Sequence, residues 1–145
     1  MALQPCAGAS ERSGRRRILL VEDEPFVREA TCSILQNAGF EVLPAEDARE
    51  AMQVYEECGQ SVDLVMTDMV LPGRTGQQLG QDLRQRSPEL AVLVTSGYGE
   101  AAYEAESPEA HTYFLAKPYS RRALVEKIEA ILRTGMIPRA ATQAG

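Results

Sequence analysis

Short runs rich in apolar residues alternate along this chain with longer segments of helical periodicity, and this alternation limits the folds that it can adopt. Five such runs are present, at residues 18–21, 40–43, 62–67, 91–95 and 112–115. A continuous apolar run indicates a strand that is covered on both faces. Strands that alternate with helices form parallel sheets with right-handed crossovers. The sequence therefore predicts an α/β domain: a doubly wound, five-stranded parallel sheet with five helices.

Helix start and stop signals lie between these strands. The first helix is expected to begin at Pro25, because proline at the first helical position loses no hydrogen bond, and to end before Gly39. Asp47 and Ser120 are suitable N-caps for the second and the last helix. The segment 98–110 is rich in alanine and glutamate but weakly periodic, so we expect a short or mobile fourth helix there.

The chain has 145 residues, the length of one ordinary domain. Residues 1–14 are rich in Ala, Gly and Ser and predict a disordered N-terminal extension. The folded domain is expected over 15–134, followed by a flexible C-terminal tail over 135–145. About ten residues follow the last predicted helix, so we expect no helix-turn-helix output domain in this chain.

Net charge and hydropathy restrict the partners. The formal net charge is −6 and the pI is near 4.9, whereas a nucleic-acid binder is usually basic. The apolar runs are too short to cross a membrane, and the first residues lack the apolar core of a secretory signal. We therefore expect a cytoplasmic protein with no direct contact to nucleic acid or membrane. The basic cluster at 15–17 is interpreted as a solvated entry into the first strand.

Polar side chains follow four of the five predicted strands. Glu22 and Asp23 come after the first strand, Asp68 after the third, Ser96 after the fourth and Lys117 after the fifth. The functional crevice of an open parallel sheet lies outside the carboxyl ends of its strands. These five side chains are therefore expected to converge at one edge of the sheet.

Such a set of side chains is suited to phosphoryl transfer. Clustered carboxylates raise one another's pKa unless a cation compensates them, and oxygen ligands favour Mg²⁺. His111 is the only histidine and precedes the fifth strand, which argues against zinc and against a histidine base. A hard cation, a lysine and a hydroxyl can neutralise and position a phosphoryl group. A carboxylate can itself be the nucleophile, giving an aspartyl-phosphate.

Four segments of the chain resemble the receiver domain of two-component response regulators. They are Ile-Leu-Leu-Val-Glu-Asp-Glu-Pro at 18–25, Asp-Leu-Val-Met-Thr-Asp-Met-Val-Leu-Pro-Gly at 63–73, Val-Leu-Val-Thr-Ser-Gly-Tyr at 92–98 and Phe-Leu-Ala-Lys-Pro-Tyr at 114–119. The resemblance covers about residues 15–134. It implies the flavodoxin-like (βα)5 receiver fold and a regulatory phosphoacceptor rather than an enzyme, with at most self-phosphorylation and self-dephosphorylation. The donor would be a histidine kinase or a histidine phosphotransfer protein.

The resemblance also implies a role for each polar residue at the strand ends. Asp68 would be the phosphoacceptor and a ligand of Mg²⁺. Asp23 would bind the metal directly and Glu22 through water, with the backbone carbonyl of Val70 as a further ligand. Glu22 stands where the family often has aspartate, and its longer side chain is compatible with a water-mediated contact.

The remaining implied roles concern the phosphoryl group and the switch. Ser96 would hydrogen-bond the phosphoryl oxygens, and Lys117 would pair with them. The switch aromatic would be Phe114, which lacks the hydroxyl of the tyrosine often found there, so a readout through that hydroxyl is not expected. The serine–glycine turn after the fourth strand also resembles receivers of hybrid sensor kinases, so the sequence leaves open a stand-alone protein or a module of such a kinase.

An output protein would bind the face made by the fourth helix, the fifth strand and the last helix. Arg121, Arg122 and Tyr119 are candidate contacts on this face, and the sequence leaves a homodimer open. The chain could instead be a degenerate receiver that acts as a scaffold, or a flavodoxin-like nucleotide or flavin module, although acids at 22–24 replace a glycine-rich phosphate loop. A further alternative is an aspartate-nucleophile phosphatase, which needs a second aspartate where Val70 stands.

Overall fold

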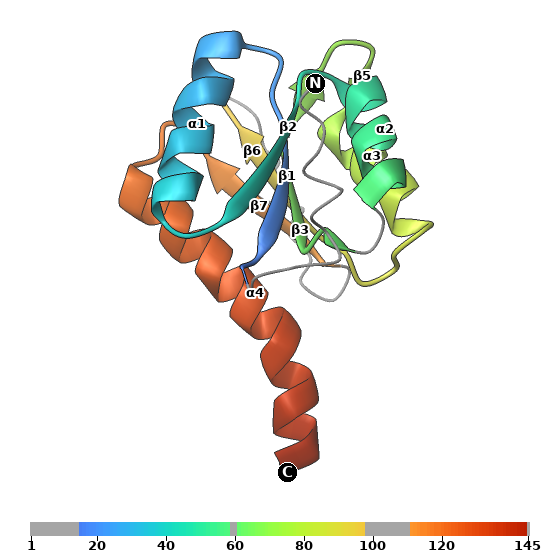
Figure 1. Ribbon diagram of the computed structural model, residues 1–145, viewed down its shortest axis with the longest axis vertical. Helices are drawn as coiled ribbons and strands as arrows, with labels where there is room; N and C mark the ends of the chain where they lie inside the picture. Colours follow the sequence, from blue (N-terminus) through green and yellow to red (C-terminus); the bar gives the residue numbers. More distant parts are fainter. Residues whose placement is uncertain (1–14, 59–60, 98–110, 145) are drawn as a thin grey trace.

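Five parallel strands form the central sheet of this computed structural model, which describes residues 15–58, 61–97 and 111–144 (Figure 1). The strands are β1 (Arg17–Val21), β2 (Glu41–Ala45), β3 (Leu64–Asp68), β6 (Ala91–Ser96) and β7 (Thr112–Ala116). Their spatial order is β2-β1-β3-β6-β7, and every neighbouring pair is parallel. The predicted doubly wound sheet is confirmed.

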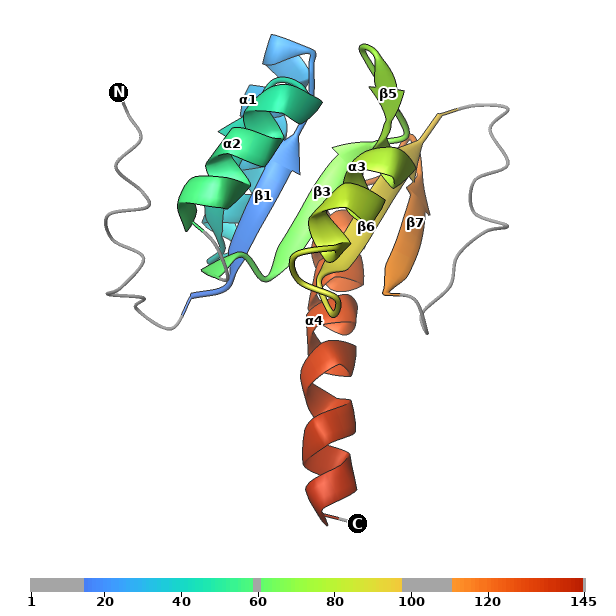
Figure 2. The ribbon, with the colours of Figure 1, turned by 90° about the vertical axis from the view of Figure 1, so that its right-hand side faces the viewer.

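Helices cover both faces of this sheet. They are α1 (Pro25–Asn37), α2 (Ala48–Cys58), α3 (Gly76–Arg84) and α4 (Arg121–Ala144). Helices α1 and α4 lie on one face, and α2 and α3 lie on the other (Figures 1 and 2). The fourth helix predicted in 98–110 and the extension predicted over 1–14 lie outside the described residues.

The apolar strands supply two separate hydrophobic clusters, one on each face. In β1, Leu19 and Val21 pack with residues of α2 and α3, whereas Ile18 and Leu20 pack with residues of α1 and α4. All four side chains are buried. This division explains the uninterrupted apolar run, because successive side chains of a strand point to opposite faces and here both faces are covered.

A short hairpin occupies the loop that follows β3. Its strands β4 (Val70–Leu71) and β5 (Arg74–Thr75) pair antiparallel around Gly73, which has a positive φ of 83°. Thr75 then caps helix α3: its hydroxyl accepts a hydrogen bond from the Gln78 amide, and the Gln78 side chain accepts one from the Thr75 amide. The sequence predicted only a loop here; the hairpin and this capping box fix the start of α3.

Gly76, the first residue of α3, lies very close to the end of β3. A Cβ atom at this position would be 2.2 Å from the backbone oxygen of Asp68 and 2.9 Å from the methyl group of Thr67. The Gly76 amide donates a hydrogen bond of 2.7 Å to the carbonyl of Met69. Only glycine allows helix and strand to approach this closely.

Arg17 is buried, so its interpretation as a solvated residue is wrong. Its side chain is 1% exposed. One nitrogen of the guanidinium donates to both carboxylate oxygens of Glu41 at 3.1 Å, and the other donates to the Ser61 hydroxyl at 2.8 Å. These partners lie on neighbouring segments of the sheet's amino edge and compensate the buried charge.

Helix α4 continues to Ala144, whereas the sequence predicted that the helix would end before Gly135. Its first half is anchored to the sheet by the buried Leu124, Ile128 and Ile131, and the rest projects beyond the sheet (Figure 2). Among the described residues, no helix is long and apolar enough to cross a membrane.

Candidate functional site

Three carboxylates converge at the carboxyl edge of the sheet. Glu22 and Asp23 follow β1, and Asp68 is the last residue of the neighbouring strand β3. One carboxylate oxygen from each lies within 4.8 Å of the others. Glu22 is buried, Asp68 is partly buried and Asp23 is exposed, so the cluster reaches from the interior to solvent. The convergence expected for the three acids is thus present.

Lys117 joins this cluster from the end of β7. Its Nζ atom lies 2.7 Å from Oδ1 of Asp68, and its backbone amide donates to the carbonyl of Ser96. Burial lowers the pKa of Lys117, but the hydrogen bond and the negative charge of Asp68 outweigh this effect and raise the pKa above its usual value. The lysine is therefore a fixed positive charge against Asp68.

Glu22 has a strongly perturbed acidity. Burial and then the negative charge of Asp68 raise its pKa from 4.5 to about 7, although the Glu24 amide donates to it at 3.1 Å and opposes this shift. Two carboxyl groups that share one site cannot both ionise without a compensating charge. A cation bound among these acids would supply that charge.

Ser96, at the end of β6, completes the predicted set. Its side chain is 1% exposed, and among the described residues its hydroxyl has no hydrogen-bond partner. Because an unpaired buried hydroxyl is unfavourable, this atom is available to an oxygen of a bound group. The acidic cluster, the lysine and this hydroxyl together have the chemistry that a magnesium ion and a phosphoryl group require.

Two threonines that sequence reasoning missed also contact Asp68. The Thr95 hydroxyl donates to Oδ1 of Asp68 at 2.9 Å, and the Thr67 hydroxyl donates to the Asp68 backbone oxygen at 3.0 Å. The sequence feature that could have pointed to them is a hydroxyl side chain at the end of an otherwise apolar strand. We assigned such a role only to Ser96, since the neighbouring threonine could equally have been an ordinary strand residue.

Three other residues singled out in the sequence lie around this centre. Val70 is 63% exposed in β4, and Phe114 is buried in the cluster beneath α2 and α3. Tyr119 is half-buried: it packs on the cluster beneath α1 and α4, and its phenol hydrogen-bonds with the Thr31 side chain. Its role in a partner surface stays a prediction. The metal role of Val70 and the switch role of Phe114 stay predictions.

Replacing Glu22 by glutamine should stabilise the metal-free protein above neutral pH. The raised pKa of Glu22 means that the folded state holds a proton between pH 4.5 and about 7 that the unfolded state has lost, so stability falls as pH rises through this window. Without Mg²⁺, Glu22→Gln is expected to gain about 2 kcal/mol at pH 8 and little at pH 4. Urea unfolding in a metal chelator measures this difference. An equal gain at both pH values would contradict the assignment.

The sheet order and the cluster of acids and lysine at its carboxyl edge define the receiver class of doubly wound α/β domains. The chain belongs to the family described as the response regulator receiver domain, which residues 18–129 match. The family and the fold predicted from the sequence are confirmed.

The relatives include a sensor kinase and transcriptional regulators. The chain is 37% identical over 125 residues to sensor kinase CckA of Brucella abortus, and 34% identical over 121 residues to the phosphate regulon regulatory protein PhoB of Escherichia coli. These matches cover 86% and 81% of this chain, but only 13% and 52% of those proteins. The chain is thus similar to one module of each relative.

Solved receiver domains match almost over their whole length. A response regulator receiver domain protein from Clostridium thermocellum has a TM-score of 0.77 at 25% identity, with 84% of this chain and 98% of that chain covered. The receiver domain of the hybrid histidine kinase CckA has a TM-score of 0.68 at 33% identity, with 80% and 98% covered. Receiver domains of this kind act in phosphorylation signalling.

Proposed function

We propose that this chain is a phosphorylation-dependent switch of a two-component system or phosphorelay in which Asp68 accepts the phosphoryl group. The observation that carries this proposal is the 2.7 Å contact between Lys117 and Asp68 within a cluster of three carboxylates. Asp68 is the member of that cluster whose side chain is 12% exposed and already paired with a cation. Asp68 is therefore held beside a cation and is still reachable from solvent.

The same residues provide the metal site of the proposal. Glu22, Asp23, Asp68 and the carbonyl of Val70 would hold Mg²⁺, with Glu22 acting through water. The raised pKa of Glu22, which arises from burial and then from the negative charge of Asp68, supports this arrangement, because a bound cation would favour the charged form of the carboxyl group. When bound, the ion would neutralise charge on the phosphoryl oxygens.

The transfer itself exchanges one bond for another. A carboxylate oxygen of Asp68 forms the bond to phosphorus while the bond between phosphorus and a histidine nitrogen of the donor breaks, and its electron pair stays on that nitrogen. Lys117 and Ser96 would then contact the phosphoryl oxygens. These contacts differ between the free and the phosphorylated domain, as a two-state switch requires. Phe114 would respond as the buried switch aromatic.

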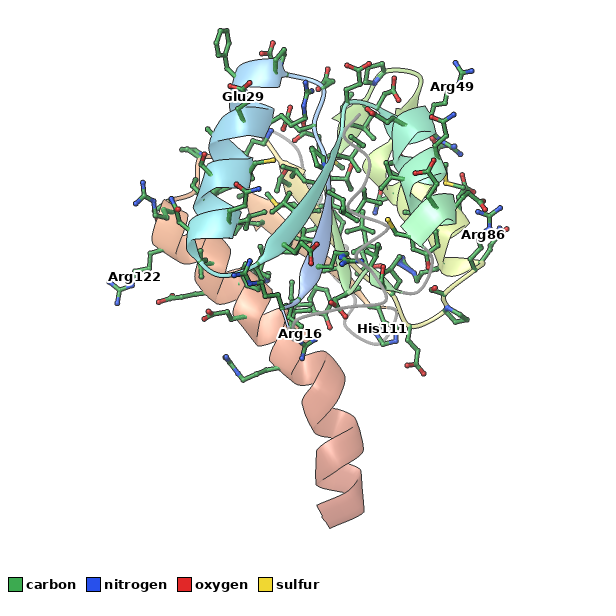
Figure 3. The ribbon with its side chains drawn as sticks, in the orientation of Figure 1. Arg16, Glu29, Arg49, Arg86, His111 and Arg122 are labelled. Atoms are coloured by element: carbon green, nitrogen blue, oxygen red, sulfur yellow. The ribbon has the colours of Figure 1, made fainter. Side chains whose placement is uncertain are left out.

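A histidine kinase or a histidine phosphotransfer protein is the proposed phosphoryl donor. Because the domain would have to meet this donor, the proposed location is the cytoplasm. The output protein would bind the face that includes β7 and α4. Arg121 and Arg122 are exposed there, and Arg122 points outward from α4, where it pairs with Glu126 at 3.1 Å (Figure 3). A scaffold without phosphorylation would not need this set of side chains, and Val70 supplies no acid for a phosphatase mechanism.

The test is phosphoryl uptake from a small donor. The protein is incubated with phosphoramidate, whose phosphorus–nitrogen bond resembles that of phosphohistidine, with Mg²⁺ or with a chelator. Intact-mass analysis should detect one phosphoryl group per chain, only with Mg²⁺, and brief exposure to hydroxylamine should remove it, as expected for an acyl phosphate. Absence of any uptake from phosphoramidate or acetyl phosphate in Mg²⁺ would refute the proposal.

A further inference from the structure

We propose that Thr95 is a positioning residue for Asp68 and that its hydroxyl shortens the lifetime of the phosphorylated form. This inference rests on the proposed function, because it concerns the same carboxylate. It assigns a role to a residue outside the set of acids, serine and lysine predicted from the sequence.

Strand pairing places Thr95 beside the carboxylate. In the parallel ladder between β3 and β6, Thr95 is the partner of Asp68, and the Met69 amide donates to the Thr95 carbonyl at 2.8 Å. Thr95 is 3% exposed. Its position is therefore fixed by the sheet on one side and by buried neighbours on the other.

The Asp68 carboxylate is the better acceptor for the Thr95 hydroxyl. The hydroxyl lies 2.9 Å from Oδ1 of Asp68 but 3.5 Å from the backbone oxygen of Thr67, which is at the outer limit of a hydrogen bond. A backbone oxygen would be enough to pair the hydroxyl of a threonine that had only a structural role. The contact with Asp68 is consequently an interaction with the nucleophile itself.

Two donors share one oxygen of Asp68. Lys117 and Thr95 both contact Oδ1, at 2.7 Å and 2.9 Å, so the bond to phosphorus forms at the other oxygen, Oδ2. On phosphorylation the long lysine side chain can move to the phosphoryl oxygens. Thr95 cannot follow, because its short, β-branched side chain is held in the sheet. It stays on Oδ1, which becomes the carbonyl oxygen of the acyl phosphate.

This fixed hydrogen bond favours the free carboxylate over the acyl phosphate. A hydrogen bond is stronger to a charged acceptor than to a neutral carbonyl. In hydrolysis a water oxygen forms the bond to phosphorus, the Oδ2–phosphorus bond breaks, its electron pair returns to the carboxylate, and the water gives its proton to solvent. As negative charge returns to Oδ1, the hydrogen bond from Thr95 strengthens. Thr95 therefore assists departure of the Asp68 carboxylate.

Thr95→Val removes the hydroxyl and keeps the β-branched shape. The variant, phosphorylated with acetyl phosphate and Mg²⁺ and then freed of donor, is expected to lose its phosphoryl group about three- to tenfold more slowly than the wild type. Its phosphorylation by acetyl phosphate should be no slower. Thr95→Ser should decay at nearly the wild-type rate. Thr67→Val is the matched control, since it removes a neighbouring hydroxyl that contacts only the backbone of Asp68.

Several results would overturn this inference. They are an unchanged or faster decay in Thr95→Val, slow decay also in Thr95→Ser, or an equal slowing in Thr67→Val. If Thr95→Val does not fold, Thr95→Ala provides the same comparison without the hydroxyl. A wild type that takes up no phosphoryl group would refute the proposed function and this inference together, whereas normal uptake with unaltered decay in the variant would refute only the role of Thr95.

Discussion

Asp68→Asn should abolish phosphoryl uptake and leave the domain folded. The amide has nearly the same shape as the carboxylate and can still accept the hydrogen bond from Thr95, but it lacks the negative charge and the nucleophilic oxygen pair. Uptake from phosphoramidate should fall below detection in intact-mass spectra. Circular dichroism and urea unfolding would establish that the variant is folded.

A second aspartate provides the control for this experiment. Asp82 of α3 pairs with Arg74 at 2.5 Å and is not a member of the acidic cluster. Asp82→Asn makes the same chemical change and should leave uptake at the wild-type level. Uptake by Asp68→Asn at the wild-type rate would show that another residue is the phosphoacceptor.

Lys117→Ala should uncouple phosphorylation from the conformational response. Loss of Lys117 removes the cation that lies 2.7 Å from Asp68, but a bound metal ion would still neutralise much of the phosphoryl charge, so uptake should persist at a reduced rate. The lysine is the proposed contact that differs between the two states. Without this contact, phosphorylation stabilises the active conformation over the inactive one by less, so it shifts the equilibrium between them less.

Backbone amide NMR spectra measure this uncoupling. In the wild type, phosphorylation or beryllofluoride should shift signals from β6, β7 and α4 as well as those around Asp68. In phosphorylated Lys117→Ala the shifts should be confined to the immediate surroundings of Asp68. Lys127→Ala, which removes the charge of a different lysine, in α4, serves as the control. A wild-type pattern of shifts in phosphorylated Lys117→Ala would exclude the coupling role.

The sheet and the charged part of the site could be predicted because each depends on local sequence. Strand-length apolar runs identify strands covered on both faces, and the ends of parallel strands meet at one edge. The rule that strand ends meet at one edge was enough to predict that Asp68 and Lys117 lie close together, although they are far apart in the chain. No detail of side-chain packing was needed for either conclusion.

What the sequence did not reveal depends on contacts between distant segments. Arg17 is indistinguishable in sequence from the two arginines before it, and its burial is compensated by Glu41 and Ser61, which the fold places beside it. Thr95 is an ordinary strand residue by composition, and only the register of β3 against β6 places it opposite Asp68. Local periodicity contains neither the register of two strands nor the partner of a buried charge.

The close approach of α3 to β3 limits how this site could be transplanted to another protein. The five polar side chains could be copied onto the strand ends of an unrelated parallel sheet. If the residue corresponding to Gly76 carried a Cβ, however, that atom would meet the backbone oxygen of the transplanted aspartate and displace it. A working graft must therefore include this glycine and the hairpin that leads to it, as well as the charged groups.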